Sequence, residues 1–113
     1  LTSIERATWE EIYRRHPLDE VEKLAEMAHK AGADGFICAP GETPKLRALY
    51  PEAIIVNPGV RSEAVSAGDQ KRIGSPAGAL AYGANYIVMG RQILGAKDPV
   101  QEVERVLHDE LHL

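Results

Sequence analysis

The sequence contains a single cysteine, Cys38, so the chain can form no internal disulfide and no multi-cysteine metal site. Cys38 lies in the apolar run DGFICAP (34–40), where a buried thiol is a better interpretation than a nucleophile. No apolar run approaches the roughly 20 residues of a membrane-spanning helix, and no signal-peptide pattern opens the chain. The simplest location is therefore the cytoplasm.

Basic residues are also outnumbered, because 13 Lys and Arg stand against 17 Asp and Glu and the formal net charge is -4. This charge argues against a general nucleic-acid surface, so any anion site must be a local cluster of basic groups. The 113 residues, 44% of them hydrophobic, are enough for one globular domain with a real core. The opening Leu-Thr-Ser has no initiator Met and looks like the end of a strand, so we expect the chain to start inside a fold.

Three short apolar runs predict parallel strands at 34–38, 53–57 and 85–89, because they lack the alternation of half-exposed strands. Helical patterns separate them. One helix is expected over 19–31, ended by Gly32, and three others begin at Thr43-Pro44, Ser75-Pro76 and Asp98-Pro99, each with a capping side chain beside a proline. Thr8 and Glu11 suggest a capping box for one more short helix. In the last helix, the apolar positions expected to face inward are Val100, Val103, Val106, Leu107 and Leu111.

Strict alternation of helix and strand predicts an α/β fold with a parallel sheet. The segment AGADGFICA (31–39) resembles YGANYIVMG (82–90), so the chain repeats a βα unit. A (β/α)8 barrel uses about 31 residues per unit, and at that rate the chain supplies about the last half of a TIM-type barrel. A flavodoxin-like open sheet is the structural alternative, and it would need at least one more strand.

Basic and amide side chains follow the last two predicted strands. Arg61 lies just after Pro58-Gly59, Gln70 lies in the long irregular segment that follows, and Gly90-Arg91 ends the last strand. In (β/α)8 barrels the loops after the last two strands often bind phosphate. Gly90 lets the backbone approach a phosphate, while the two arginines and the Gln70 amide can donate to its oxygens. These four residues therefore predict a phosphate site.

The order and spacing of NPGVR, GDQKRI, YGANYIVMGRQI and AKDP resemble the C-terminal half of the orotidine 5'-phosphate decarboxylase family over essentially the whole chain. One departure is Asn57, where Thr or Ser often precedes Pro-Gly. The resemblance implies a cofactor-free lyase of pyrimidine biosynthesis that converts orotidine 5'-phosphate to UMP and works as a cytoplasmic homodimer. It implies no metal, nucleic-acid or membrane partner.

The resemblance also implies residue roles. Arg61, Gln70, Arg91 and the Gly90 backbone would bind the 5'-phosphate, Pro58 would line the base pocket, Thr2 and Ser3 would lie near the pyrimidine and ribose, and the loop 59–74 would close over the ligand. The family's catalytic Asp-x-Lys-x-x-Asp motif is missing here, because Asp69-Gln70-Lys71 is followed by Gly74 at the required position. We therefore expect no catalytic residue in residues 1–113, which form the C-terminal half of a single barrel domain.

Two other functions stay open at this point. Related sugar-phosphate decarboxylases and synthases share the Gly-Arg strand end, although Gln70 argues against them. A half-barrel standing alone could instead be a phosphate-binding module without catalysis, or could pair with itself to rebuild a barrel.

Overall fold

The computed structural model describes residues 6–13, 16–63 and 74–113. The described elements are, in chain order, α1 (Arg6–Tyr13), α2 (Pro17–Lys30), β1 (Gly35–Ile37), the 3₁₀ turn η1 (Pro40–Glu42), α3 (Thr43–Leu49), β2 (Ile54–Pro58), α4 (Pro76–Ala81), β3 (Tyr86–Val88), α5 (Arg91–Leu94), α6 (Pro99–Arg105) and the π-helical turn η2 (Val106–Glu110). The three predicted strands are confirmed, with bounds that differ by one residue. None of the described helices is long and apolar enough to cross a membrane.

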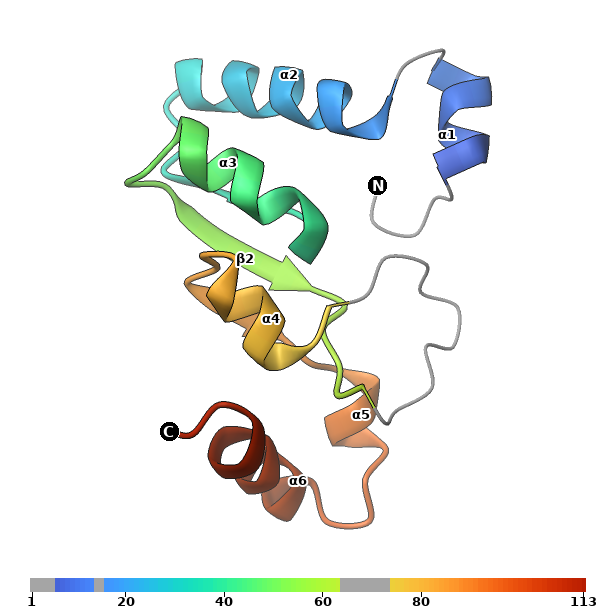
Figure 1. Ribbon diagram of the computed structural model, residues 1–113, viewed down its shortest axis with the longest axis vertical. Helices are drawn as coiled ribbons and strands as arrows, with labels where there is room; N and C mark the ends of the chain where they lie inside the picture. Colours follow the sequence, from blue (N-terminus) through green and yellow to red (C-terminus); the bar gives the residue numbers. More distant parts are fainter. Residues whose placement is uncertain (1–5, 14–15, 64–73) are drawn as a thin grey trace.

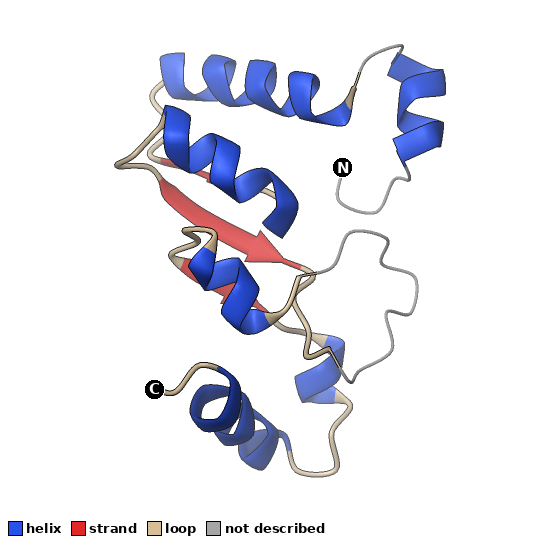
Figure 2. Cartoon of the chain, viewed as in Figure 1, coloured by secondary structure: helices blue, strands red, loops and turns tan. Residues whose placement is uncertain are grey.

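The strands form one parallel sheet in the order β1-β2-β3. Right-handed crossovers between neighbouring parallel strands place their connecting helices on one face of the sheet. Figure 1 shows α2, α3, α4 and α6 following one another along the long axis of the molecule, and Figure 2 shows α3 and α4 lying over the sheet. The sheet therefore has a helix-covered side and an opposite side.

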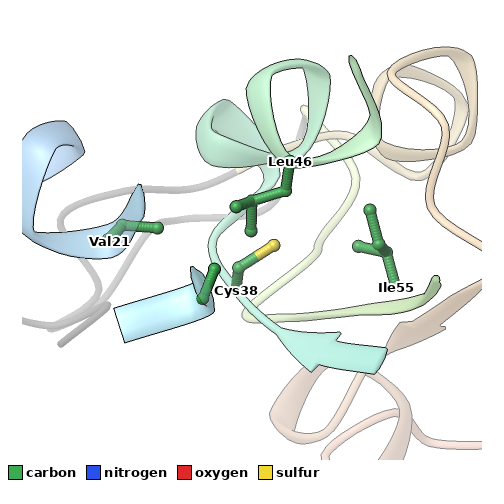
Figure 3. Close-up of a cluster of buried hydrophobic side chains, with 5 residues drawn as sticks. Val21, Cys38, Leu46 and Ile55 are labelled. Carbon is green, nitrogen blue, oxygen red and sulfur yellow. The ribbon is translucent and has the colours of Figure 1, made fainter. Parts of the chain in front are cut away.

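The core lies on the helix-covered side (Figure 3). It consists of buried side chains of α2, α3 and β2 and of the residue that follows β1, namely Val21, Ala25, Leu46, Ile55 and Cys38. Burial raises the pKa of the Cys38 thiol, which therefore stays protonated in the core. The interpretation of Cys38 as a buried structural thiol is confirmed.

The opposite face of the sheet is apolar and open. Ile37, Ile54, Tyr86 and Val88 are 77%, 48%, 63% and 50% exposed, and within the described ranges no helix covers them. In a (β/α)8 barrel this face is the interior, which side chains of the other strands fill. A doubly wound open sheet would carry helices on both faces. The arrangement is that of part of a (β/α)8 barrel.

Two glycines end helices α2 and α4 in the same way. Gly32 and Gly83 have φ angles of 91° and 101°, a conformation that side chains with a Cβ rarely adopt. In each case the glycine N–H and the N–H of the next residue both donate to carbonyls in the last turn of the helix. These bonds run from Gly32 to His29 and from Ala33 to Ala28, and from Gly83 to Leu80 and from Ala84 to Ala79. These paired bonds are the Schellman motif, so the repeated Gly-Ala pattern encodes the same turn twice.

Two predicted helix caps are confirmed and two are wrong. The side chains of Ser75 and Asp98 accept hydrogen bonds from backbone N–H groups in the first turns of α4 and α6. Thr8 lies inside α1 and cannot begin it. Thr43 makes no capping bond, because its hydroxyl donates to the side chain of Asn57 on β2 instead.

The apolar positions of α6 and η2 are less buried than predicted. Val106 is 4% exposed, but Val100, Val103 and Leu107 are 68%, 40% and 37% exposed. The prediction that these three face inward is therefore wrong for the described structure. The reason is that α6 packs against α5 and continues into η2 instead of lying flat on the sheet.

Arg47 of α3 ties together the loops that enter β2 and β3. Its guanidinium donates to the carbonyls of Pro51 and Ala53 at 2.7 Å each, and to the Gly83 carbonyl at 2.8 and 3.1 Å. It also donates to Asn85 Oδ1 at 2.7 Å. These bonds therefore lie at the amino ends of β2 and β3, at the opposite end of the sheet from the carboxyl ends of the strands.

Replacing Arg47 by methionine is expected to lower the free energy of unfolding by about 2 kcal/mol, because the charged donor is lost while the aliphatic stem remains. Lys45→Met is the matched control, since the ion pair of Lys45 with Glu22 is partly exposed to water and its loss should change stability by less than about 1 kcal/mol. Chemical denaturation of both variants measures the difference, and equal losses would contradict the role given to Arg47.

Candidate functional site

A cavity of about 240 Å³ lies at the carboxyl ends of β2 and β3. Its lining includes Pro58, Arg61, Gly90 and Arg91, which are all the predicted site residues that the structure describes. Gly59, Val60, Val88 and Gln92 complete the lining. The sheet register explains the meeting, because Pro58 at the end of β2 pairs directly with Val88 at the end of β3.

Arg61 reaches the cavity from the extension of β2. Val60 forms a parallel bridge with Gly74, and the Arg61 N–H donates to the Gly74 carbonyl at 3.1 Å. The backbone at Val60 and Arg61 is therefore hydrogen-bonded to the backbone at Gly74. Arg61 itself is 9% exposed, so its charge is held in a largely desolvated position, where a hydrogen bond to a bound anion would be stronger than in water.

Gly90 and Arg91 form the other side of the cavity. Gly90 precedes α5, and a Cβ added to it would meet no atom of the described residues within 4 Å apart from its neighbours in the chain. The backbone here is open to a ligand, as the prediction for Gly90 requires. Arg91 is exposed at the first position of α5. Two guanidinium groups lining one small cavity can bind the oxygens of a phosphate through charge-assisted hydrogen bonds.

A buried polar cluster supports the Pro58 side of the cavity. Asn57, 0% exposed, donates from Nδ2 to the Cys38 carbonyl at 2.9 Å and to Thr43 Oγ1 at 2.8 Å. The Thr43 hydroxyl in turn donates to Asn57 Oδ1 at 3.0 Å. Asn57 therefore joins the end of β2 to the end of β1 and to α3. This explains how the chain accommodates Asn before Pro-Gly.

Sequence reasoning missed a polar network beside the cavity. It contains Ser62, Gln92, Glu102, Arg105 and Glu110. All of these except Gln92 also line a second cavity of about 640 Å³. The only signal in the sequence was that Gln92 and Ser62 directly follow the two arginines. No three His, Cys, Asp or Glu side chains gather as a metal site in the part of the chain that the structure describes.

The network contains a carboxylate whose titration can be tested. Arg105 and then Gln92 donate to Glu102 and lower the pKa of its carboxyl from 4.5 to about 2. Because the folded pKa is the lower one, the stabilisation is complete above pH 4.5 and is lost as the pH falls from 4.5 to about 2. The protein with Glu102 should therefore melt at a higher temperature than the Glu102→Gln variant at neutral pH, and this difference in melting temperature should nearly vanish by pH 2. A difference that does not depend on pH would contradict the ion pair.

Three predicted site residues, Thr2, Ser3 and Gln70, lie outside the described residues, as does most of the predicted loop 59–74. Their roles stay predictions.

Residues 1–106 match the model of the family described as "Orotidine 5'-phosphate decarboxylase / HUMPS family". The orotidine 5'-phosphate decarboxylase of Rhodopseudomonas palustris is 44% identical over 96 residues, which cover 84% of this chain and 40% of that protein. The one of Paramagnetospirillum magneticum is 43% identical over 108 residues, covering 94% and 46%. The crystal structure of orotidine 5'-phosphate decarboxylase from Lactobacillus acidophilus matches with a TM-score of 0.73 and 33% identity, over 94% of this chain and 44% of that one. The chain thus spans a little under half the length of these relatives.

Proposed function

The chain belongs to the orotidine 5'-phosphate decarboxylase / HUMPS family, and from this membership we propose that it is the phosphate-binding half of an enzyme that decarboxylates orotidine 5'-phosphate to UMP. The observation that carries this proposal is the cavity in which Pro58, Arg61, Gly90 and Arg91 meet. Its size of about 240 Å³ suits a phosphate group and adjoining atoms better than a whole nucleotide. The names of the relatives favour the nucleotide over a sugar phosphate.

Each lining residue has a defined part in this proposal. Arg61 and Arg91 bind the phosphate oxygens from two sides, and the Gly90 N–H donates a further hydrogen bond. Pro58 lies against the pyrimidine, and Thr2, Ser3 and Gln70 act at the two ends of the nucleotide. Binding energy from a phosphate remote from the reacting carboxylate lowers the barrier when it is realised in the transition state.

The remaining proposals concern the whole enzyme. Residues 1–113 form the C-terminal half of a single (β/α)8 barrel, and the open apolar face of the sheet supports this, because such a face is filled in a complete barrel. The catalytic Lys and Asp residues belong to the other half. The enzyme works without a cofactor, as a homodimer in the cytoplasm.

Decarboxylation is tested by comparing two proteins. The natural polypeptide that carries this sequence is expected to release CO₂ from orotidine 5'-phosphate, whereas a polypeptide of only residues 1–113 is expected to release none. Adding the separately prepared first half of the Rhodopseudomonas palustris relative should restore the reaction. Turnover by residues 1–113 alone would contradict the assignment of catalysis to the other half. Turnover of a pentulose phosphate in preference to the nucleotide by the natural polypeptide would overturn the proposed substrate.

A further inference from the structure

Gln92 makes a two-point connection between the segments that carry the cavity's two arginines. Its Oε1 accepts a hydrogen bond from the Ser62 N–H at 2.9 Å, and its Nε2 donates to Ser62 Oγ at 2.7 Å. Ser62 directly follows Arg61, and Gln92 directly follows Arg91. The connection therefore joins the backbone next to one arginine to the side chain next to the other.

An ionic cluster fixes the orientation of this carboxamide. Gln92 Nε2 also donates to Glu102 Oε1 at 2.7 Å, and Arg105 donates to both oxygens of Glu102 at 2.8 and 3.1 Å. Because a carboxylate only accepts and a backbone N–H only donates, the amide can satisfy both neighbours in one orientation alone. The cluster therefore holds the Gln92 oxygen toward Ser62.

The same cluster holds Ser62 from its other side. Ser62 Oγ donates to Glu110 of η2 and accepts from Arg105 Nη2 at 2.9 Å, and Arg105 Nη1 donates to Glu110 at 2.8 Å. Ser62 is 4% exposed, so water has little access to replace these bonds. The backbone beside Arg61 is thereby tied to α5, α6 and η2 together.

We propose that Gln92, acting with Ser62, is a positioning residue that sets the spacing of Arg61 and Arg91 for a phosphate group. A bidentate phosphate contact requires each guanidinium to be held within about 0.5 Å of its productive place. Two bonds to one carboxamide, itself held by an ion pair, supply that constraint. The inference rests on the proposed function, because it assumes that the two arginines bind phosphate.

The test measures the affinities for UMP and for uridine by calorimetry, in the natural polypeptide and in Gln92→Met. Methionine keeps the length of the side chain but can make neither bond to Ser62. We expect UMP to bind about tenfold more weakly and uridine to bind as before, since only the phosphate contacts depend on the spacing. Gln101→Met is the matched control, because Gln101 is an exposed position of α6 whose variant should bind both ligands normally.

The possible outcomes separate the positioning role from a purely structural one. If Gln92→Met lowers the melting temperature but leaves the ratio of UMP to uridine affinity unchanged, the network only stabilises the fold and the proposal is overturned. Arg91→Ala tests the proposed function separately. A normal ratio in that variant would reject phosphate binding itself, whereas a reduced ratio with a normal Gln92→Met would reject only the positioning role.

Two further variants keep the test decisive. Gln92→Glu retains the shape but cannot donate to Ser62 and places a second carboxylate beside Glu102, so it should not rescue UMP affinity. Should Gln92→Met fail to fold, Ser62→Ala keeps the bond from the Ser62 N–H to Gln92 but removes the side-chain half of the connection, together with the bonds of Ser62 Oγ to Glu110 and Arg105. It should weaken UMP binding about threefold, again without affecting uridine. An unchanged ratio in Ser62→Ala would then reject the proposal.

Discussion

Replacing Arg91 by alanine is expected to weaken UMP binding about a hundredfold while the affinity for uridine stays the same. Hydrogen bonds to a charged group contribute about 1.5–3 kcal/mol each, and the loss of about 3 kcal/mol corresponds to a factor above one hundred in the dissociation constant. Arg91 lines the cavity together with Arg61, so its loss leaves Arg61 as the one arginine of the described residues that lines this cavity. Calorimetric titration with the two ligands measures the effect directly.

Two control variants make this result specific. Arg91→Lys retains the charge but not the planar pair of donors, so it should recover only part of the UMP affinity. Lys97→Ala removes an exposed positive charge from the turn between α5 and α6 and should bind UMP normally. A parallel loss of uridine affinity in Arg91→Ala would mean that the cavity binds some other part of the ligand.

Replacing Asn57 by leucine is expected to lower the free energy of unfolding by about 3 kcal/mol. The Cys38 carbonyl and the Thr43 hydroxyl would each lose a hydrogen bond to Asn57 in a site closed to water. A buried polar group left without a partner costs about 1–3 kcal/mol. Asn57→Thr should cost less, because its hydroxyl can keep one of the bonds. Urea denaturation of the variants supplies the measurement.

A double-mutant cycle tests whether the cost comes from unpaired polar groups. Thr43→Val removes the hydroxyl, so in the double variant with Asn57→Leu only the Cys38 carbonyl loses its partner. The two substitutions together should therefore cost less than the sum of their separate effects, by about 1 kcal/mol. Additive losses would show that changes of volume, and not lost hydrogen bonds, dominate.

Local features of this protein were predictable from the sequence because their causes lie within a few residues. Ser75 and Asp98 stand beside prolines at helix starts, and each caps its own first turn. Gly32 and Gly83 end helices because a positive φ angle is available to them at little cost. The three apolar runs became parallel strands, and their order in the chain placed Pro58 and Gly90-Arg91 at one end of the sheet.

Other features were decided only by the tertiary structure. Thr43 has the sequence context of a cap, yet its hydroxyl binds Asn57 fourteen residues away, because the sheet brings that amide within reach. Gln92 binds Ser62 across 30 residues, although neither residue type by itself indicates a partner. The sequence by itself thus determined the three strands, the helices that precede and follow them and the basic groups at the strand ends, but not the short helix α5 that carries Gln92. The strand register and the packing of α6 decided which polar side chains hold them in place, because a long-range hydrogen bond depends on the position of two segments at once.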